Sequence, residues 1–471
     1  MADRAKTGLQ TTGLYKTGLQ KKGRQVHACS ECGYASPKWF GKCPDCGAWS
    51  SATASTSARG DDASVKITSL SDCGPAPDRL RSGLDEIDRV LGGGLVPGGV
   101  VLLGGEPGVG KSTIVLQLLD GLAKSGHRPL LVSGEESAHQ IAMRAARLGI
   151  PGDSLRVAVT ESLQATLTAC EQEHPDVLVI DSVQTLTDAT FDQAAGSVVQ
   201  VRECAAALVR YAKAGGAAVV LIGHVTKDGS LAGPKTLEHV VDAVLSLEGE
   251  RDGSLRLLRA LKNRFGSCEE LGVMSMSEQG LQRVADPSAM LLADRHPGAS
   301  GSVVFPSLDG VRPMLVELQA LVTKCTFSQP RRVSLGLEQR RLALALAVLS
   351  EKAGIKFEER DVFVSAAGGI VVKETAVDLA LCIALVSAVG DDPIDPQTVA
   401  IGEVGLSGEI RRVSGIQRRL AEASRLGFER AIVPPGVKSG GAGMHLKTAA
   451  DLRTAVHLAT RPRGQARLAA G

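Results

Sequence analysis

The segment from Gly105 to Thr113 has the residue types and spacing of a phosphate-binding loop. Up to Ser112 it fits the pattern GxxxxGK[ST], and the whole segment reads Gly105-Glu106-Pro107-Gly108-Val109-Gly110-Lys111-Ser112-Thr113. Glycines allow backbone N–H groups to surround a phosphate, the lysine reaches the outer phosphates, and the serine hydroxyl can hold Mg²⁺. We therefore predict that this loop binds a nucleoside triphosphate with Mg²⁺; a glycine-rich turn that fits the pattern by chance is the alternative.

Polar side chains follow three further apolar runs that read as strands. Glu135 and Glu136 come after residues 130–133, Asp181 after 177–180 and His224 after 218–222. Ligands of parallel sheets gather at the carboxyl ends of the strands, so we expect these groups near the loop. Asp181 would join Ser112 in holding Mg²⁺.

The two adjacent glutamates have different expected roles. Glu135 stands where a carboxylate could orient and deprotonate the attacking water, although sequence alone separates it poorly from Glu136. One of them, more readily Glu136, could instead cap the helix whose first turn contains Ser137. His224 could sense the γ-phosphate through a hydrogen bond, or be a structural histidine.

Lys262 and Arg264 form a pair of cations at the end of another expected strand, residues 255–261. They stand two residues apart, so on an extended backbone they point to the same side. Such a pair suits a triphosphate or a nucleic-acid backbone, and a solvated turn is the alternative. These residues alone leave the choice open.

Four cysteines near the N-terminus have the spacing of a zinc site. Two CxxC pairs are separated by ten residues, with Gly33 and Gly47 directly after the pairs, and the cysteines are Cys29, Cys32, Cys43 and Cys46. Four thiolates complete a closed tetrahedral Zn²⁺ site that leaves no position for water, so we expect a structural metal. Disulfides or a redox CxxC pair are the alternatives.

Cations and aromatic residues lie between the two cysteine pairs. Residues 1–50 hold eight Lys or Arg against three acids, and residues 38–42 include Lys38, Trp39, Phe40 and Lys42. This combination suits a nucleic-acid strand. A protein-docking finger, in which Trp39 and Phe40 cap a small core, remains open.

The composition indicates a globular protein of about three domains. The chain has 471 residues, 44% hydrophobic residues, ten cysteines and a net charge of +2. It contains no apolar stretch long enough to span a membrane and no signal-peptide core, so we expect a cytoplasmic location without membrane contact. Near-neutral charge means that a polyanionic partner would need a local basic surface.

Apolar runs alternate with amphipathic stretches, which predicts a mostly parallel α/β sheet. Strands are expected at 100–103, 130–133, 177–180, 218–222, 243–247 and 255–261, with a helix at 112–122 and a hairpin turn at Asp252-Gly253. Beyond residue 287 we expect helices at 338–352, 376–387 and 416–426, strands at 362–365 and 431–433, and a hairpin at 399–413. The expected domains are a flexible tail (1–25) with Thr-Gly-Leu repeats, a zinc finger (26–49), a linker (50–65), a nucleotide domain (66–286) and a second α/β domain (287–471).

These motifs together resemble the bacterial RadA (Sms) family of DNA repair and recombination ATPases. The resemblance rests on the four-cysteine finger with its Ser-Pro-Lys-Trp stretch, residues 105–113, Ser-Gly-Glu-Glu-Ser at 133–137 and Lys-Asn-Arg-Phe-Gly at 262–266. It implies a RecA-like ATPase core that forms a hexameric ring, like the replicative helicase DnaB. It also implies an ATP-driven motor for branch migration or unwinding of branched recombination intermediates, with single-stranded and branched DNA, a recombinase filament or other repair proteins as partners.

The resemblance also implies roles for single residues. Lys262 and Arg264 would act in trans on the γ-phosphate of a neighbouring subunit, or couple hydrolysis to DNA. Glu135, and not Glu136, matches the catalytic carboxylate. DNA contacts would come from the loops after Asp181 and after His224, the latter with Lys227 and Lys235.

The C-terminal α/β domain resembles the proteolytic domain of Lon, which uses a serine nucleophile and a lysine base. At the matching positions this sequence has Ala376 and Gln417. A methyl group cannot attack a carbonyl and an amide cannot act as its base, so we expect a catalytically silent scaffold. An ATP-dependent regulator or scaffold of a protease-like assembly is the alternative function.

Overall fold

The computed structural model describes residues 25–31, 34–36, 38–56, 69, 71, 75, 77–153, 155–223, 236–249, 255–325, 329–438 and 443–460. The chain divides into two compact units. One contains Met1–Pro75 with Ser197–Val199, and the other contains Ala76–Gly196 and Gln200–Gly471. Within the described residues, no helix is long and apolar enough to cross a membrane.

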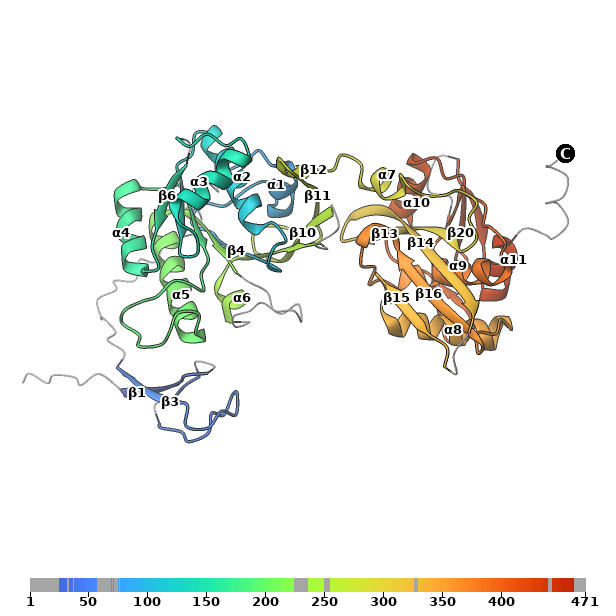
Figure 1. Ribbon diagram of the computed structural model, residues 1–471, viewed down its shortest axis with the longest axis horizontal. Helices are drawn as coiled ribbons and strands as arrows, with labels where there is room; N and C mark the ends of the chain where they lie inside the picture. Colours follow the sequence, from blue (N-terminus) through green and yellow to red (C-terminus); the bar gives the residue numbers. More distant parts are fainter. Residues whose placement is uncertain are drawn as a thin grey trace, which may run out of the picture. The chain divides into compact units, whose positions relative to one another are not determined.

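The first unit contains a small antiparallel sheet, whose strand β1 ends at Cys29 (Figure 1). Its strand order is β2-β1-β3, with β1 at Gln25–Cys29, β2 at Ala35–Ser36 and β3 at Ala52–Thr56. Residues between β2 and β3 form a loop that is closed by a bridge between Lys42 and Trp49. The sheet is too small to bury a sizeable core, so a bound metal is the expected source of its stability.

The second unit begins with a nine-stranded sheet, in the order β12-β11-β10-β9-β4-β8-β7-β5-β6 (Figure 1). Its six parallel strands are β4 (Val100–Gly105), β5 (Pro129–Ser133), β6 (Arg156–Val159), β7 (Val177–Asp181), β8 (Ala218–Ile222) and β9 (Ala243–Glu248). The antiparallel extension contains β10 (Leu255–Asn263), β11 (Leu271–Ser277) and β12 (Gly280–Arg283). The mostly parallel sheet predicted from the alternating pattern is confirmed.

Helices cover both faces of this sheet, and the alternation along β4 shows how the faces are divided. Val101 and Leu103 pack into a core with α1 (Asp85–Leu91) and α2 (Lys111–Lys124). Val100 and Leu102 point the other way, into a core with α4 (Leu163–Glu173) and α5 (Val198–Gly215). Burial on both faces explains why these strands read as continuous apolar runs. Two further helices are α3 (Ala138–Arg147) and α6 (Thr236–Val240).

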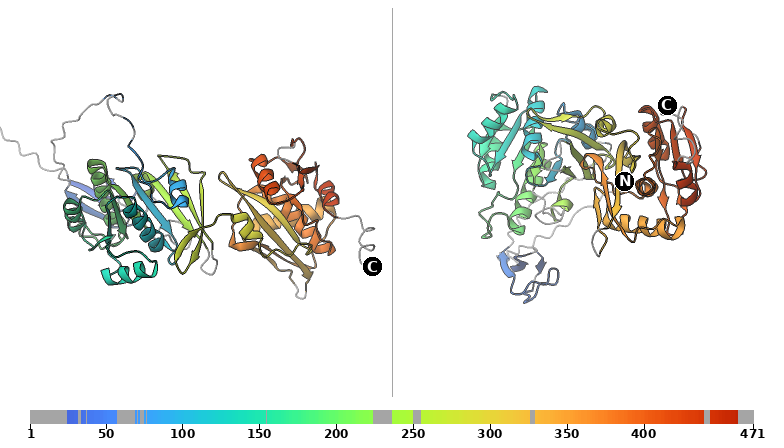
Figure 2. Two further views of the ribbon diagram at one scale, coloured as in Figure 1. Left: turned by 90° about the horizontal axis from the view of Figure 1, so that it is seen from above. Right: turned by 45° about the vertical axis from the view of Figure 1, so that its right-hand side comes forward.

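Residues 302–448 form a second, seven-stranded sheet, in the order β15-β16-β14-β13-β17-β20-β21 (Figure 2). The strands are β13 (Ser302–Asp309), β14 (Arg312–Lys324), β15 (Arg332–Leu335), β16 (Arg360–Ala366), β17 (Thr398–Ala400), β20 (Arg430–Val433) and β21 (His445–Thr448). The helices are α7 (Pro287–Leu292), α8 (Gln339–Ala353), α9 (Asp378–Gly390), α10 (Ile416–Arg425) and α11 (Leu452–Ala459). The short 3-10 turns η2 (Ala367–Gly369) and η3 (Thr375–Val377) precede α9.

The hairpin predicted at residues 399–413 is wrong in its first half. β17 pairs in parallel with β13 and β20 in the large sheet, and the hairpin is shorter, with β18 (Glu403–Val404) opposite β19 (Ile410–Arg411). The apolar run at Val399–Ile401 therefore belongs to a buried parallel strand. A short apolar run is compatible with either arrangement, so its sequence could not decide. The helix predicted at 376–387 begins at Asp378, because Ala376 lies in η3.

Candidate functional site

The loop from Gly105 to Ser112 connects the buried strand β4 to the first turn of α2. Gly108 and Gly110 have φ angles of 84° and 114°, a conformation that side chains rarely allow. At Gly105, a Cβ would lie 2.7 Å from the carbonyl oxygen of Leu247. Glu106 to Gly108 are exposed, whereas the helix behind them is packed into the core. The loop thus presents backbone N–H groups and a helix N-terminus, which is the arrangement that binds phosphate.

Lys111 lies inside this loop. Its Nζ donates hydrogen bonds to the carbonyl oxygens of Gly105 (2.8 Å) and Glu106 (3.1 Å), and the residue is 6% exposed. Burial lowers the pKa of Lys111, and the nearby carboxylates of Asp181 and Glu135 partly oppose that shift. The chain therefore brings Lys111, Asp181 and Glu135 together from three elements that are distant in sequence.

Asp181 is the last residue of β7 and is 9% exposed. Its neighbour in the sheet is Ser133, at the end of β5, and its carbonyl oxygen accepts a 2.9 Å bond from the Gly134 N–H. Ser112 is the second residue of α2. A hydroxyl at the helix start and a carboxylate at a strand end are the oxygen donors that Mg²⁺ takes beside a phosphate, so the residues present fit a triphosphate with Mg²⁺.

The two adjacent glutamates are held by different partners. The Ser182 hydroxyl donates a 2.5 Å hydrogen bond to Glu135, whereas Glu136 forms an ion pair with Arg144 on α3. Ser137 is the N-cap residue of α3 and makes a capping box with Gln140, so neither glutamate caps this helix. Glu135 is thus the carboxylate associated with the end of β7.

Lys262 and Arg264 lie at the opposite edge of the sheet from the phosphate loop. Lys262 pairs with Val244, which lies beside Leu102 in β4, whereas Gly105 lies beside Leu247. Leu102 precedes Gly105 by three residues in β4, so the two cations lie about 10 Å from the start of the loop, toward the amino ends of the parallel strands. The loop itself extends further in the other direction, so the chain does not bring these cations to its own loop.

Both cations have partners at that amino edge. The Nζ of Lys262 donates to the carbonyl oxygens of Glu238 (2.6 Å) and Val241 (2.7 Å), at the end of α6. Burial, and then the Arg264 charge, lower the pKa of Lys262. Arg264 forms a 3.1 Å ion pair with Asp242, whose other oxygen accepts the N–H of Val100 at the start of β4.

Three of the predicted zinc ligands converge in the first unit. The sulfur atoms of Cys29, Cys43 and Cys46 all lie within 4.8 Å of one another. Cys29 and Cys46 are separated by 3.7 Å between sulfurs, which exceeds a disulfide bond of about 2.05 Å. Gly47 has a φ of 76°, as the turn after a CxxC pair requires. The three thiols fit a zinc ion, and Cys32 lies outside the described residues.

The tryptophans of the finger do not cap a core. Trp39 is 66% exposed and Trp49 is 73% exposed, and these are the two tryptophans of the whole sequence. Trp49 lies under the Lys42 ammonium group, 5.6 Å from the ring centre, while Tyr34 and Phe40 make the internal edge-to-face contact. The interpretation of Trp39 as a core cap is therefore wrong.

The positions that match a protease dyad contain no paired nucleophile and base. Ala376 is buried in η3, while Gln417 is exposed on α10 and donates to the carbonyl oxygen of Lys438. Between these elements the buried guanidinium of Arg419 forms an ion pair with Glu374. It also donates to the carbonyl oxygens of Pro306 (2.8 Å) and Ser414 (3.0 Å).

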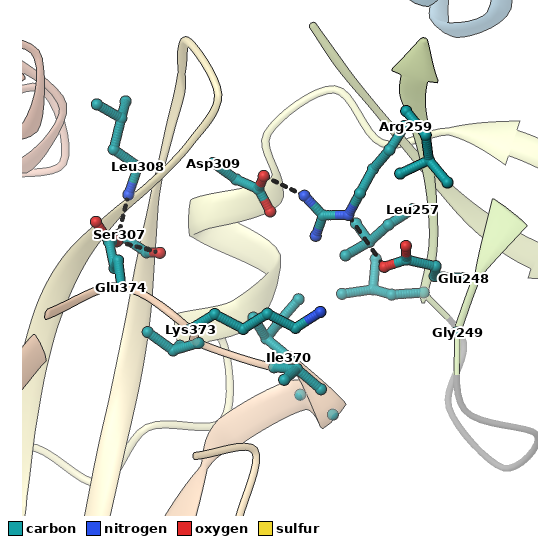
Figure 3. A pocket seen from close by; sticks show the side chains of 16 residues that line it. Glu248, Gly249, Leu257, Arg259, Ser307, Leu308, Asp309, Ile370, Lys373 and Glu374 are labelled. Atoms are coloured by element: carbon teal, nitrogen blue, oxygen red, sulfur yellow. Dashed lines mark hydrogen bonds and ion pairs between the residues drawn. The ribbon is translucent and has the colours of Figure 1, made fainter. Parts of the chain in front are cut away.

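A cavity of about 370 Å³ lies between β10 and residues 307–309 and 368–374 (Figure 3). Arg259 crosses it, with ion pairs to Asp309 and, at 3.0 Å, to Glu248. Glu374 accepts hydrogen bonds from the Ser307 hydroxyl and the Leu308 N–H. Among the residues that the structure describes, none of those predicted to bind nucleotide lines this cavity.

Several sequence predictions fall outside the described residues, namely His224, Lys227, Lys235 and the N-terminal Thr-Gly-Leu repeats. Sequence reasoning also missed residues that contact the site. Ser182 follows Asp181 directly, and Arg256 donates to the loop carbonyl of Val109. A charged residue inside the apolar run Leu255-Arg256-Leu257-Leu258 could have indicated a buried arginine with a specific partner.

Models of three known families match separate parts of the chain. Residues 27–52 match the rubredoxin metal binding domain, residues 75–230 match the AAA domain, and residues 337–436 match subunit ChlI of Mg-chelatase. The first match covers the cysteine cluster, and the second covers the phosphate loop with Glu135 and Asp181.

The chain is similar over most of its length to curated proteins named DNA repair protein RadA. It is 49% identical to that of Pseudomonas aeruginosa over 92% of this chain and 98% of the relative. It is 47% identical to that of Escherichia coli (87% and 92%) and 42% identical to that of Mycolicibacterium smegmatis (92% and 96%). With such identity over nearly the full length of these relatives, the chain belongs to the RadA family of DNA repair proteins.

Proposed function

We propose that this protein is a DNA-dependent ATPase of recombinational repair that assembles into a hexameric ring and drives branch migration or unwinding of branched DNA. The relatives are named DNA repair proteins, and the loop from Gly105 to Thr113 with Asp181 fits ATP and Mg²⁺. The observation that carries the proposal is the placement of charged groups at the two edges of one sheet. Lys111, Glu135 and Asp181 lie at the carboxyl edge, and Lys262 and Arg264 lie at the amino edge.

The residues at the carboxyl edge have distinct roles in hydrolysis. Backbone N–H groups of the loop and of the first turn of α2 bind the phosphates, and Lys111 exchanges its carbonyl partners for the outer phosphates. Ser112 and Asp181 would hold Mg²⁺, which would neutralise charge on the phosphates. Glu135, oriented by Ser182, accepts a proton from the attacking water.

The amino-edge cations complete the site of a neighbouring subunit. A head-to-tail interface places one edge of a subunit against the other edge of the next, and repetition of that contact closes a ring. Lys262 and Arg264 are only partly buried, and the side chain of Arg264 is 52% exposed, so both can reach a partner. In this arrangement they would bind the γ-phosphate that the neighbour holds.

Mixing two inactive variants tests this arrangement. K111A lacks the loop lysine and R264A lacks the trans cation, so each alone should lose ATP turnover. In mixed rings about a quarter of the interfaces combine an intact loop with an intact Arg264, and turnover should return in that proportion. No recovery in mixtures that form rings by native mass measurement would contradict the trans role, while full activity of K111A alone would contradict the ATPase itself.

DNA dependence needs a separate measurement. We expect single-stranded DNA to increase ATP turnover, and a forked duplex to be unwound only with hydrolysable ATP. The expected DNA contacts are the loops after Asp181 and after His224, and a recombinase filament or other repair proteins would be the protein partners. If DNA neither increases ATP turnover nor is unwound, the proposed DNA-dependent motor function is contradicted, although the protein could still hydrolyse ATP. We expect the protein in the cytoplasm, where bacterial DNA is located.

The C-terminal α/β region serves in this proposal as a scaffold of the ring and not as a peptidase. The buried methyl group of Ala376 and the outward-facing Gln417 support that role. The alternative is a regulator of a protease-like assembly. It has less support, because Ala376 and Gln417 replace the nucleophile and the base at the matching positions. Hydrolysis of a protein substrate that disappears in T375A or S414A would contradict the scaffold role.

A further inference from the structure

Arg256 is a buried cation whose side chain reaches the phosphate loop from β10, a strand of the same sheet. It lies in β10 and is 4% exposed. Its Nε donates a 2.9 Å hydrogen bond to the carbonyl oxygen of Val109, and Nη1 donates a 2.8 Å bond to the carbonyl oxygen of Leu255. Val109 lies between the two loop glycines that have positive φ angles, so this contact is with the phosphate-binding loop itself.

The geometry of a peptide group gives the Val109 contact a consequence for nucleotide binding. In a trans peptide the C=O and the following N–H point in opposite directions. A guanidinium that holds the Val109 carbonyl on the sheet side therefore turns the Gly110 N–H toward the opposite side. Gly110 is the N-cap residue of α2, and its carbonyl already accepts the first helical bond from Ile114. Its N–H belongs to the group of donors that a phosphate meets at a helix start.

Two glycines, Gly249 and Gly110, allow close packing around this contact. At Gly249, a Cβ would lie 2.6 Å from the Cδ atom of Arg256, so the glycine makes space for the side chain. At Gly110, a Cβ would lie 2.6 Å from the Cε atom of Met276. Burial lowers the pKa of Arg256, which reflects the cost of placing a cation there. A side chain that only filled space would not require a charged group.

We propose that Arg256 is a positioning residue for nucleotide binding, which orients the Gly110 N–H toward the phosphates through the Val109 carbonyl. The inference rests on the part of the proposed function that assigns a triphosphate to this loop. It is independent of DNA, of ring assembly and of the C-terminal region.

A matched set of variants separates positioning from structural support. R256Q removes the charge and the forked donor, and R256K keeps a charge with a single donor group. The control is R295Q, because Arg295 is another buried arginine that donates to a backbone carbonyl, that of Pro396, in the C-terminal region. For each full-length variant we would measure the Kd for fluorescent mant-ADP with Mg²⁺, and the thermal midpoint without nucleotide.

We expect R256Q to raise the Kd about tenfold or more, as loss of a charged hydrogen bond predicts, and R256K to raise it by a smaller factor. R295Q should lower the thermal midpoint and leave the Kd unchanged. If R256Q fails to fold, R256K decides the question: a raised Kd at an unchanged thermal midpoint supports positioning. An unchanged Kd in a folded R256Q, or in R256K when R256Q does not fold, overturns it. Failure of the wild type to bind mant-ADP would instead refute the triphosphate assignment.

Discussion

The hydroxyl of Ser182 donates a 2.5 Å hydrogen bond to the carboxylate of Glu135, across the gap between the ends of two neighbouring parallel strands. Ser182 is fully buried and follows Asp181, whereas Glu135 is exposed. The buried donor thus fixes one oxygen of the carboxylate beside the expected magnesium ligand. The adjacent Glu136 is instead paired with Arg144 on α3.

These different partners predict different effects of two matched substitutions. E135Q should reduce kcat for ATP about a hundredfold or more, because an amide cannot accept the proton of the attacking water. Nucleotide affinity should change little, since the loop is intact. E136Q should retain turnover and lose only the Arg144 ion pair. Steady-state ATP hydrolysis with mant-ADP binding checks both, and equal losses of kcat in the two variants would remove the distinction between the glutamates.

The lowered pKa of Lys111 predicts how nucleotide affinity depends on pH. Burial holds this pKa below the ordinary 10.5, and a bound polyphosphate favours the protonated amine. Linkage then requires that affinity be full below the pKa of the free protein and fall as pH rises through it. We expect mant-ADP affinity to decline at alkaline pH before an ordinary lysine would titrate. K111R should lose this decline, because arginine stays protonated; a pH-independent affinity in the wild type would argue against the assignment.

Arg419 and Glu374 predict a large and specific loss of stability in the C-terminal region. Arg419 is 1% exposed, so R419M leaves Glu374 without its buried partner and should cost about 3 kcal/mol in the free energy of unfolding. The double variant E374Q/R419M should cost less. The control is R418M on the same helix, where Arg418 is exposed, with an expected change below about 0.5 kcal/mol. Urea unfolding followed by circular dichroism measures each, and similar losses for R419M and R418M would contradict the prediction.

The finger should lose its order when zinc is removed, and its tryptophans report on it alone. Trp39 and Trp49 are the two tryptophans of the sequence, and both belong to residues 27–52, the segment that contains the cysteine cluster. We expect a chelator, or C43S, to lower the anisotropy of tryptophan emission, because so small a sheet depends on its metal. A W39F/W49F variant gives the background signal. Unchanged anisotropy after metal analysis has confirmed zinc loss would count against a structural zinc.

Much of the nucleotide site could be predicted because its signals are local. The spacing from Gly105 to Ser112 is a continuous motif, and Asp181 and Glu135 each follow an apolar run, so parallel strands alone bring them to one edge. The fold class and the strands predicted at 218–222 and 177–180 follow from the same pattern, and β7 extends one residue further, to Asp181. Local signals also gave the three described cysteines that converge.

The remaining features depend on which strands become neighbours, and sequence patterns do not contain that information. That Lys262 lies at the far edge from the loop follows only from the antiparallel pairing of β10 with β9. The contact of Arg256 with Val109 joins residues 147 positions apart. The hairpin predicted at 399–413 is wrong at β17 because an apolar run of three residues does not identify the strand with which it pairs.

The pairing of β10 with β9 shifts register between Ala260 and Lys262, so that Leu261 is an additional residue in the strand. Without this shift, regular alternation through Leu261 would place Lys262 on the face of Leu258 and Ala260, toward the core with α1 and α2. With it, Lys262 reaches the end of α6. Leu261 is 59% exposed and packs into none of the cores that the described residues form; as the unpaired residue of the bulge, it changes the face of the sheet on which the following residue lies. A chain that paired Leu261 regularly with Val244 would keep every catalytic side chain and yet aim its lysine at the wrong side of its own sheet.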